Sequence, residues 1–355
     1  MSEANPITPP RRAGCLANGL LVLISLAIAF AVGEVGLRVY HRFAPPKVIT
    51  IDERLGWRAT ANLRMNIPTT DACGTTESII IETNDRGFRV YGDPASGRKK
   101  ILVLGDSYTF AKDVSQSDTF YATLAKSMDA EFFVYGGDGY GTLQEYYILD
   151  EYLDEIKPDV IVWQFCINDL FDNSLELNYC SWMSNCRYRK PYCMEDGSIH
   201  YVNAGNLPWL RDTTMKYSKL LYSLLIRVNG MLETPMDPAI SAEVEIERDG
   251  AAHPGFQRAV GITKTLMKRV KTRAGKIPIV AYTSDKQGLY FDTYRSLCQD
   301  LDIPFADKVT TAIDAAETSG TCLRASDKAH WNKAAHAIVA KELEPYLREA
   351  LLSRP

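Results

Sequence analysis

The chain has 355 residues, of which 46% are hydrophobic and 24% are charged, and its formal net charge is −4. This length allows one large domain or two small ones, and the composition is that of a folded globular protein. Because the chain has no general excess of basic residues, it lacks the electrostatic footprint of a nucleic-acid-binding protein, and we expect no nucleic-acid partner.

The first predicted element is a long apolar helix near the N-terminus. Residues 13–32 contain no charged side chain, and Arg11 and Arg12 precede them. A segment of this length can cross the hydrocarbon core of a bilayer as a helix. Basic residues beside a short tail favour a cytoplasmic N-terminus. We therefore expect a cytoplasmic tail over residues 1–12, a single transmembrane helix over residues 13–33, and the rest of the chain outside the cytoplasm (the periplasm in a bacterium).

Two other interpretations of this segment stay open. Ala29-Phe30-Ala31 has the small-residue pattern of a signal-peptidase site, and cleavage there would release the protein. The segment could instead be a core helix, although so long an apolar run at the N-terminus is more typical of a membrane anchor or a signal sequence.

A linker and a small β-containing extension are expected over residues 34–98. The stretch Ala44–Pro46 is a short, stiff connection, residues 78–81 have the apolar β-branched character of a strand, and Asp85–Gly87 has turn residues. This region is too small to form a large core alone, so we expect it to pack against the domain that begins near residue 99.

From residue 99 to residue 350 the chain alternates between short apolar runs and segments of helical periodicity. The predicted strands are 101–104, 131–135, 159–165, 277–282 and 303–305, and the predicted helices are 119–128, 143–156, 256–271, 291–301 and 331–351. Alternation of this kind predicts an α/β fold, a three-layer sandwich in which a central parallel sheet of about five strands lies between two layers of helices.

Between residues 170 and 255 the alternation stops. An interruption of this length inside such a fold is usually a lid or a binding loop. It contains an apolar helix around residues 219–226 and a cluster of three cysteines, Cys180, Cys186 and Cys193. We expect this insertion to form a cap over the active site, with a plain surface subdomain as the alternative.

The eight cysteines suit an exported domain, because disulfides persist in oxidising compartments. Sequence alone does not determine their pairing. Our first choice is a disulfide between Cys298 and Cys322, which flank the last predicted strand. A pair within the cysteine cluster of the insertion is the alternative.

Residues with catalytic chemistry follow three of the predicted strands. Ser107 follows the first strand, Gly139 lies in a glycine-rich turn after the second, and Asn168 follows the third. Because the carboxyl ends of parallel strands lie along one edge of a sheet, we expect these residues to meet there. Asp327 and His330 precede the last predicted helix, on a loop that can reach the same edge.

These residue types can form a serine nucleophile with its base. The hydroxyl of Ser107 needs a base to accept its proton, and His330 can accept that proton and return it to the leaving group. Asp327 would orient the imidazole and stabilise its charged form. The oxyanion of the tetrahedral intermediate needs donors, which the backbone N–H groups of Ser107 and Gly139 and the side-chain amide of Asn168 could supply.

Each element alone has a plainer interpretation. Gly105–Ser107 can occur by chance, Gly139 suits an ordinary turn, and Asn168 suits a helix cap. The catalytic interpretation is favoured because four independent elements occur in one order, each at the end of a predicted strand or just before the last helix.

The four blocks resemble those of the SGNH/GDSL hydrolase superfamily. They are Gly105–Thr109, Gly136–Thr142, Asn168-Asp169 and Asp327–His330. The resemblance implies a flavodoxin-like three-layer sandwich that needs no metal or organic cofactor. It also implies a nucleophile, its two partners and an oxyanion hole. The nucleophile is Ser107, the partners are Asp327 and His330, and the oxyanion donors are Ser107, Gly139 and Asn168.

Two positions depart from the family pattern. Cys166 stands where the third block usually has glycine, and the asparagine that commonly precedes the glycines of the second block is missing. Neither change removes a catalytic group, but both affect the geometry of the oxyanion hole.

The expected function is that of a serine hydrolase acting on ester bonds, with O-acyl or O-acetyl groups of an extracytoplasmic glycan or lipid, or a small acylated molecule, as substrate. An O-acyltransferase that modifies a cell-surface polysaccharide would use the same triad with a sugar hydroxyl in place of water. A membrane acyl-donor protein is a possible partner of such a transferase. A glycan-binding module with an unused triad is the third interpretation.

Overall fold

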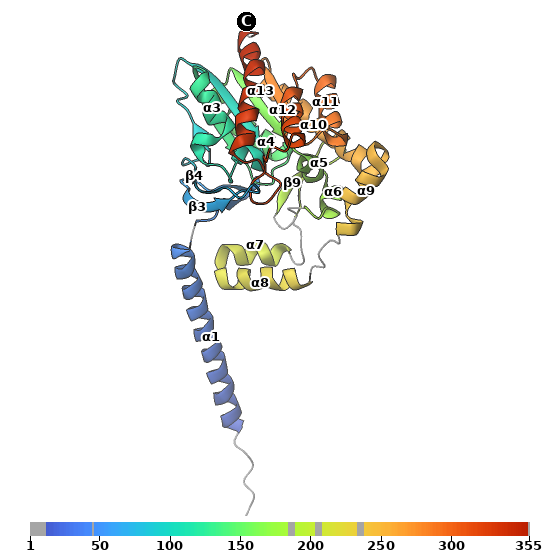
Figure 1. Cartoon of the computed structure of the whole chain (residues 1–355). Coiled ribbons are helices and arrows are strands. Elements are labelled where there is room, and N and C mark those ends of the chain that lie inside the picture. The colour runs from blue at the N-terminus through green and yellow to red at the C-terminus, as the bar shows by residue number, and fades with distance from the viewer. Residues whose placement is uncertain (1–11, 45, 184–188, 203–207, 233–237, 354–355) are drawn as a thin grey trace, which may run out of the picture. The chain divides into compact units, whose positions relative to one another are not determined.

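The computed structural model describes residues 12–44, 46–183, 189–202, 208–232 and 238–353. The chain divides into two compact units, each described here by itself (Figure 1). The smaller unit comprises Met1–Pro45 and Gly205–Thr234, and the larger comprises Pro46–Ala204 and Pro235–Pro355.

The described part of the smaller unit is helical. It contains α1 (Arg12–Phe43), α7 (Pro208–Tyr217) and α8 (Lys219–Leu232). The helix α1 continues beyond the expected boundary at residue 33, because no proline interrupts it before Pro45. Its segment Ala17–Phe43 is long and apolar enough to span a membrane, a test that a signal sequence also passes.

A five-stranded sheet with the order β11-β8-β6-β7-β5 forms the centre of the larger unit. The parallel strands are β6 (Lys99–Gly105), β7 (Ala130–Gly136), β8 (Val160–Phe165) and β11 (Ile279–Thr283), and β5 (Val90–Tyr91) pairs antiparallel with β7. The expected α/β sheet is confirmed, but its edges differ in detail. Residues 303–305 form only a single parallel bridge, Phe305 with Ala281, because helix α12 begins at Asp307.

The order of the parallel strands positions the site. The parallel strands are numbered along the chain as β6, β7, β8, β11 and the Phe305 bridge. Across the sheet they then follow the order 2-1-3-4-5, which is the flavodoxin-like order. In such sheets the order reverses between the first and third strands, here β6 and β8, and ligands bind beyond their carboxyl ends. Ser107 follows β6 and Asn168 follows β8, so both lie at this point.

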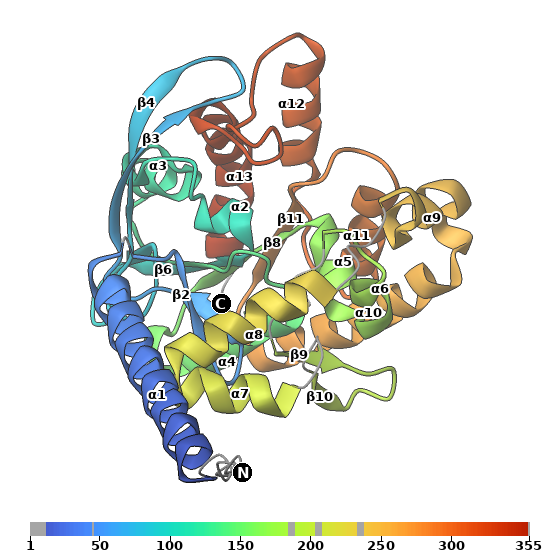
Figure 2. The same cartoon turned by 90° about the horizontal axis from the view of Figure 1, so that it is seen from below.

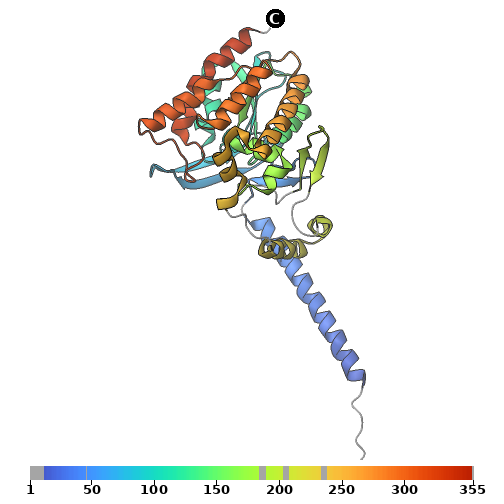
Figure 3. The ribbon, with the colours of Figure 1, turned by 90° about the vertical axis from the view of Figure 1, so that its right-hand side faces the viewer.

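Side chains alternate between two cores, one on each face of the sheet. In β6, Ile101 and Val103 belong to one core, and Leu102 and Leu104 belong to the other. The first core is covered by α3 (Phe120–Ser127), α12 (Asp307–Thr318) and α13 (Lys333–Leu352), and the second by α4 (Thr142–Ile156), α10 (Pro254–Ala274) and α11 (Leu289–Asp300). Figure 2 shows α3 and α13 on one side of the strands and α4 and α10 on the other, and Figure 3 shows the same layers from the side. The expected three layers are therefore confirmed.

The N-terminal extension packs into the second core. It contains β1 (Ile49–Asp52) paired with β2 (Gly56–Ala59), and β3 (Arg64–Thr70) paired with β4 (Thr76–Glu82). Leu55, Trp57, Ile79 and Ile81 are buried in the same core as Leu102. These residues therefore extend the core of the larger unit, as the sequence predicts.

The inserted segment is divided between the two units. The larger unit holds α5 (Ile167–Asn173), α6 (Leu175–Tyr179), β9 (Lys190–Cys193), β10 (Ile199–Val202) and α9 (Ala242–Asp249). The smaller unit holds α7 and α8. A cap over the active site formed by residues 170–255 stays a prediction.

Candidate active site

Ser107 is the first residue of the short helix α2 (Ser107–Phe110), directly after β6. Asp106 caps this helix, because its carboxylate accepts a 2.9 Å hydrogen bond from the Tyr108 N–H. A side chain at Gly105 would collide with Thr109 and Gln164, so glycine permits the tight passage from strand to helix. The backbone N–H of Ser107 is one of the N-terminal groups that the helix itself leaves free.

The structure brings Ser107, His330 and Asp327 together. The Nε2 atom of His330 lies 2.7 Å from the Oγ of Ser107, and its Nδ1 atom lies 2.5 Å from the Oδ2 of Asp327. The other oxygen of Asp327 accepts hydrogen bonds from the backbone N–H groups of Ala329 and His330, each 3.0 Å long. An imidazole held on one side by a carboxylate can accept the serine proton on its other side.

The carboxyl group of Asp327 is held in its charged form. Burial raises the pKa of Asp327, but hydrogen bonds from the His330 side chain and from the N–H groups of Ala329 and His330 outweigh this effect and leave the pKa below its ordinary value. A charged carboxylate accepts the Nδ1 proton of His330 and thereby fixes the tautomer that presents Nε2 to Ser107.

Tyr108 supports the loop that carries Asp327 and His330. Its hydroxyl donates a 3.0 Å hydrogen bond to the carbonyl of Ala329. Its ring centroid lies 4.9 Å from that of the His330 imidazole. Tyr108, the residue after Ser107, therefore contacts His330 directly and limits the movement of its loop.

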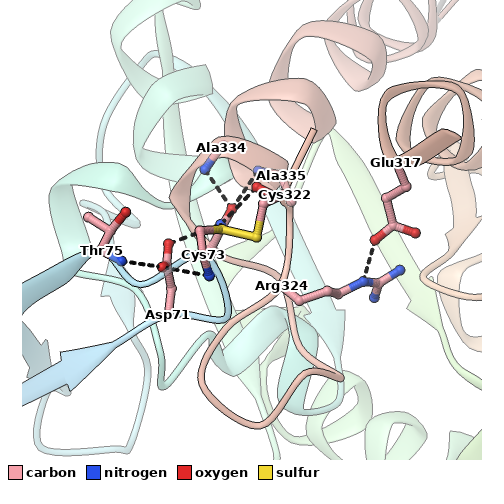
Figure 4. The surroundings of a disulfide bond; sticks show 9 residues. Asp71, Cys73, Thr75, Glu317, Cys322, Arg324, Ala334 and Ala335 are labelled. Carbon is pink, nitrogen blue, oxygen red and sulfur yellow. Dashed lines mark hydrogen bonds and ion pairs between the residues drawn. A yellow bond between two sulfur atoms is a disulfide. The ribbon is translucent and has the colours of Figure 1, made fainter. Parts of the chain in front are cut away.

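A disulfide joins Cys322, shortly before this loop, to Cys73 in the turn between β3 and β4 (Figure 4). The same turn is held by Asp71, whose carboxylate accepts a 3.3 Å hydrogen bond from the Asn332 side chain, and by a 3.1 Å bond from the Ala72 N–H to the Arg324 carbonyl. The β3–β4 hairpin thus fastens the chain on both sides of Asp327 and His330.

The expected disulfide between Cys298 and Cys322 is wrong. Cys298 is a buried free thiol in the core on one face of the sheet, whereas Leu323, next to Cys322, belongs to the core on the other face. The sheet therefore separates the two residues. Within the cysteine cluster, Cys180 and Cys193 are free, and Cys186 lies outside the described residues.

Gly139 lies in the turn after β7, and Asn168 lies in the first turn of α5, after β8, at the carboxyl edge of the sheet. The Asn168 amide donates a 2.8 Å hydrogen bond to the carbonyl of Tyr140, and its nitrogen lies 3.4 Å from a carboxylate oxygen of Asp172. Gly139 has a φ of 70°, a left-handed conformation that favours glycine. The register pairs Gly105 with Gly136, so the turns that follow β6 and β7 begin at the same level. The three expected oxyanion donors therefore share one edge.

Residues outside the motifs hold these two turns. The indole N–H of Trp57 donates a 2.7 Å hydrogen bond to the Asp138 carbonyl, and the Tyr140 hydroxyl donates a 2.7 Å bond to the Trp57 carbonyl. On the Asn168 side, Asp172 forms a buried ion pair with Lys190 of β9. Sequence analysis missed Trp57, Asp172 and Lys190, because no local pattern in one sequence signals contacts between distant segments.

Several carboxyl groups are buried beneath the strand ends. Burial raises the pKa of Asp106 to about 6 and that of Asp285 to about 7, and it raises the pKa of Asp169 well above its ordinary value. Asp169 accepts a 2.9 Å hydrogen bond from the Cys166 N–H, and Asp285 accepts a 3.0 Å bond from the Ile167 N–H. These carboxyl groups fix the start of α5, which carries Asn168.

Cys166, which stands at the family's glycine position, packs as a small buried side chain. Its residue is 7% exposed, and burial raises the pKa of its thiol well above the ordinary value. The thiol is therefore protonated and unreactive at neutral pH. The departure from the expected glycine is thus accommodated by packing beside Asp285.

Asp113, Asp327 and His330 offer possible metal ligands within 4.8 Å of one another. Both ring nitrogens of His330 already lie within hydrogen-bond distance of Asp327 and Ser107. A metal ion would have to displace one of these partners. The arrangement therefore fits a serine nucleophile with its base better than a metal centre.

A cavity of about 670 Å³ lies beside the His330 loop. Its lining includes Tyr108, Lys328 and Ala329 from around the triad, together with charged residues such as Lys286 and Arg324. Both cations pair with Glu317, at 2.9 Å and 2.5 Å. The volume is typical of a small-molecule site, and the charged lining suits a polar ligand.

No protein-family model matches the chain, and no curated protein matches its sequence. Among solved structures, a lipolytic G-D-S-L family member from Veillonella parvula is 12% identical, with 70% of this chain and 98% of that chain covered and a TM-score of 0.40. The psychrotrophic esterase EstA from Pseudoalteromonas sp. is 13% identical, with 72% and 100% covered and a TM-score of 0.38. A Clostridium thermocellum family 3 carbohydrate esterase is 11% identical, with 72% and 98% covered and a TM-score of 0.38.

The topology of the chain agrees with the resemblance drawn from its motifs. Its parallel strands have the flavodoxin-like order, helices cover both faces of the sheet, and the blocks around Ser107, Gly139 and Asn168 follow adjacent strands at one edge. Asp327 and His330 reach that edge from the loop before the last helix. The chain therefore has a flavodoxin-like three-layer α/β/α fold, the fold that the resemblance of its motifs to SGNH/GDSL hydrolases implies.

Proposed function

We propose that the protein is a serine ester hydrolase of the SGNH/GDSL type, with Ser107 as nucleophile, His330 as general base and acid, and Asp327 as its partner. The observation that carries the proposal is the pair of contacts of the His330 ring, 2.7 Å to the Ser107 hydroxyl and 2.5 Å to the Asp327 carboxylate. Nucleophile, base and orienting carboxylate within hydrogen-bond reach are the parts that acyl transfer through serine requires.

In this mechanism Ser107 Oγ attacks the ester carbonyl carbon while His330 Nε2 accepts its proton. The negative oxygen of the tetrahedral intermediate is stabilised by the N–H groups of Ser107 and Gly139 and by the Asn168 amide. The ester C–O bond then breaks, and His330 protonates the leaving alcohol. Water, deprotonated by the same histidine, hydrolyses the acyl-enzyme and regenerates Ser107.

We further propose that α1 anchors the enzyme in a membrane and that the catalytic unit works outside the cytoplasm, on O-acyl or O-acetyl groups of a glycan or lipid. Three observations support this. The segment Ala17–Phe43 has the length and composition of a membrane span. The Cys73–Cys322 disulfide suits an oxidising compartment. The cavity beside the His330 loop has a charged and polar lining that suits a polyhydroxylated ligand.

Labelling of the full-length protein in detergent with a fluorophosphonate tests the catalytic proposal, with 4-nitrophenyl acetate hydrolysis as the second readout. We expect the wild type to be labelled and to hydrolyse the ester, Ser107→Ala to lose both properties, and the exposed control Ser319→Ala to keep both. An unlabelled and inactive wild type, or labelling retained by Ser107→Ala, would contradict the proposal.

The same protein can be tested with an oligosaccharide acceptor. Release of free acid in excess of acylated sugar supports hydrolysis. Formation of acylated sugar in excess of free acid identifies an acyltransferase that uses the same triad. Oligosaccharide binding without labelling or turnover identifies a glycan-binding module.

A further inference from the structure

Outside the active site, α8 carries an exposed apolar stripe. Leu221, Leu224, Val228 and Met231 are spaced by three or four residues and so share one face of the helix. These residues are 43%, 48%, 49% and 83% exposed. A continuous apolar surface of this kind typically marks an interaction site.

The helix α8 is fastened at its N-terminus to α1. The carboxylate of Glu34 accepts hydrogen bonds from the Ser218 hydroxyl at 2.9 Å and from the backbone N–H groups of Lys219 and Leu220 at 3.0 Å and 2.9 Å. A residue of α1 therefore caps α8, and its negative charge suits the N-terminal end of the helix dipole. Arg38 of α1 adds a 3.3 Å hydrogen bond to the Tyr217 carbonyl.

These contacts place the start of α8 at a defined level of α1. Residues 13–32 carry no charge, and as a helix they span about 30 Å, the thickness of a hydrocarbon core. Glu34 is the first charged residue after them. Leu220 lies against Gly33, because a Cβ atom there would come within 3.0 Å of its side chain. The helix α8 thus begins where the apolar segment of α1 ends. Figure 2 shows α7 lying beside α8.

We propose that α8 lies in the membrane–water interface, with the stripe of Leu221, Leu224, Val228 and Met231 immersed in lipid. The proposal rests on the proposed role of α1 as an uncleaved anchor. A lipid surface is favoured over a protein partner because the stripe starts beside the boundary of the membrane-spanning segment itself.

Other exposed residues of α7 and α8 fit the same partner. Trp209 and Tyr217 are 66% and 75% exposed, and these side chains are enriched at membrane interfaces. Lys216, Lys219 and Arg227 are exposed and can attract anionic headgroups. An interfacial helix needs this combination of an apolar face and basic residues.

The test uses the full-length protein in vesicles of phosphatidylethanolamine and phosphatidylglycerol that contain a lipid with a photoactivatable acyl chain. After irradiation and proteolysis, mass spectrometry measures lipid adducts on each peptide. We expect adducts on α1 and α8 and none on the segment with Ile240 and Val244, which are also exposed apolar residues but belong to the larger unit. This segment is the matched control for exposed apolar side chains.

The double variant Leu224→Gln/Val228→Gln should lower the yield of α8 adducts about tenfold, since two apolar side chains lose their transfer energy. The control Ile240→Gln/Val244→Gln should not change it, and all variants should still hydrolyse a soluble ester, which reports correct folding. Adducts confined to α1, or cross-links from α8 to protein in place of lipid, would overturn the proposal. Absence of adducts on α1 as well would refute the anchor itself, a separate outcome.

Discussion

The indole N–H of Trp57 donates a 2.7 Å hydrogen bond to the carbonyl of Asp138, the residue before Gly139. On the other side of this glycine, the Tyr140 hydroxyl donates a 2.7 Å bond back to the Trp57 carbonyl. Trp57 is 1% exposed and comes from β2 of the N-terminal extension. The extension therefore positions one of the proposed oxyanion donors, although it contains none of the four motifs.

Trp57→Phe should lower kcat for ester hydrolysis about tenfold and change KM much less, because a displaced oxyanion donor weakens binding of the transition state more than that of the substrate. Steady-state kinetics measure both constants. The control Tyr346→Phe removes a 2.8 Å hydrogen bond to Asp307 that is not part of the site, and it should leave kcat unchanged. Equal effects of the two variants on kcat would argue against a positioning role for Trp57.

Loss of the Cys73–Cys322 disulfide should lower the free energy of unfolding by about 2–5 kcal/mol. The bond links residues 249 positions apart, and it also holds the segment before Asp327. Urea unfolding of Cys73→Ser/Cys322→Ser measures the effect. A reducing agent should destabilise the wild type and the control Cys298→Ala, but not the double variant. Wild-type stability that does not respond to the reducing agent would contradict this pairing.

Asp327→Asn should lower kcat by about 10³- to 10⁴-fold, because an amide favours the wrong tautomer of His330 and cannot stabilise its charged form. Asp113→Asn is the matched control, since Asp113 belongs to the same cluster but the 2.5 Å contact with His330 is made by Asp327. Kinetics on a soluble ester distinguish the two variants. A similar loss in both would mean that the cluster acts through its summed charge.

The contribution of Asp285 to stability should fall as pH rises from about 4 to 7. Burial raises the pKa of this residue from 3.8 to about 7. The folded protein therefore binds more protons than the unfolded chain between these two values, and the stabilisation present at low pH is lost as the pH approaches 7. Asp106, with its pKa raised to about 6, acts in the same direction.

Asp285→Asn should therefore reduce the difference between the urea midpoints measured at pH 5 and pH 8. The exposed control Asp302→Asn should leave that difference as in the wild type. If Asp285→Asn and the wild type show the same difference, the Asp285 carboxyl group is ionised at both pH values in the folded protein.

Lys190→Met should destabilise the protein by about 3–5 kcal/mol, because it leaves the carboxylate of Asp172 buried without its ion partner. Both side chains of this pair are almost completely buried, at 0% and 3% exposed. Adding Asp172→Asn to Lys190→Met should recover part of the loss, as urea unfolding will reveal. No recovery in the double variant would assign the loss to the packing of Lys190 against Tyr192, whose ring lies 4.9 Å from its ammonium group.

The amino-acid sequence predicted the order of the central elements and pointed to Ser107, Asp327 and His330, the residues of the proposed triad. Predicted strands overlap β6, β7, β8 and β11, because apolar runs and helical periodicity are local properties of the chain. The placement of Ser107, Gly139 and Asn168 at one edge followed from the rule that parallel strands end together. The helix α12 was not predicted, and neither was the short edge strand β5, which has only two residues and no recognisable pattern.

The contacts between segments far apart in the chain were visible only in the folded structure. Cys322 pairs with Cys73 across 249 residues, and Trp57 reaches Asp138 across 81. Cys298 is nearer to Cys322 in sequence, but it cannot be the partner of Cys322 because the sheet lies between the cores to which Cys298 and Leu323 belong. Such pairings depend on which faces of the sheet and which loops meet after folding. The residues within one segment do not indicate which distant segment it will contact. The sequence motifs thus identify Ser107 as the proposed nucleophile. The fold brings together the distant residues that position Ser107 and its proposed partners.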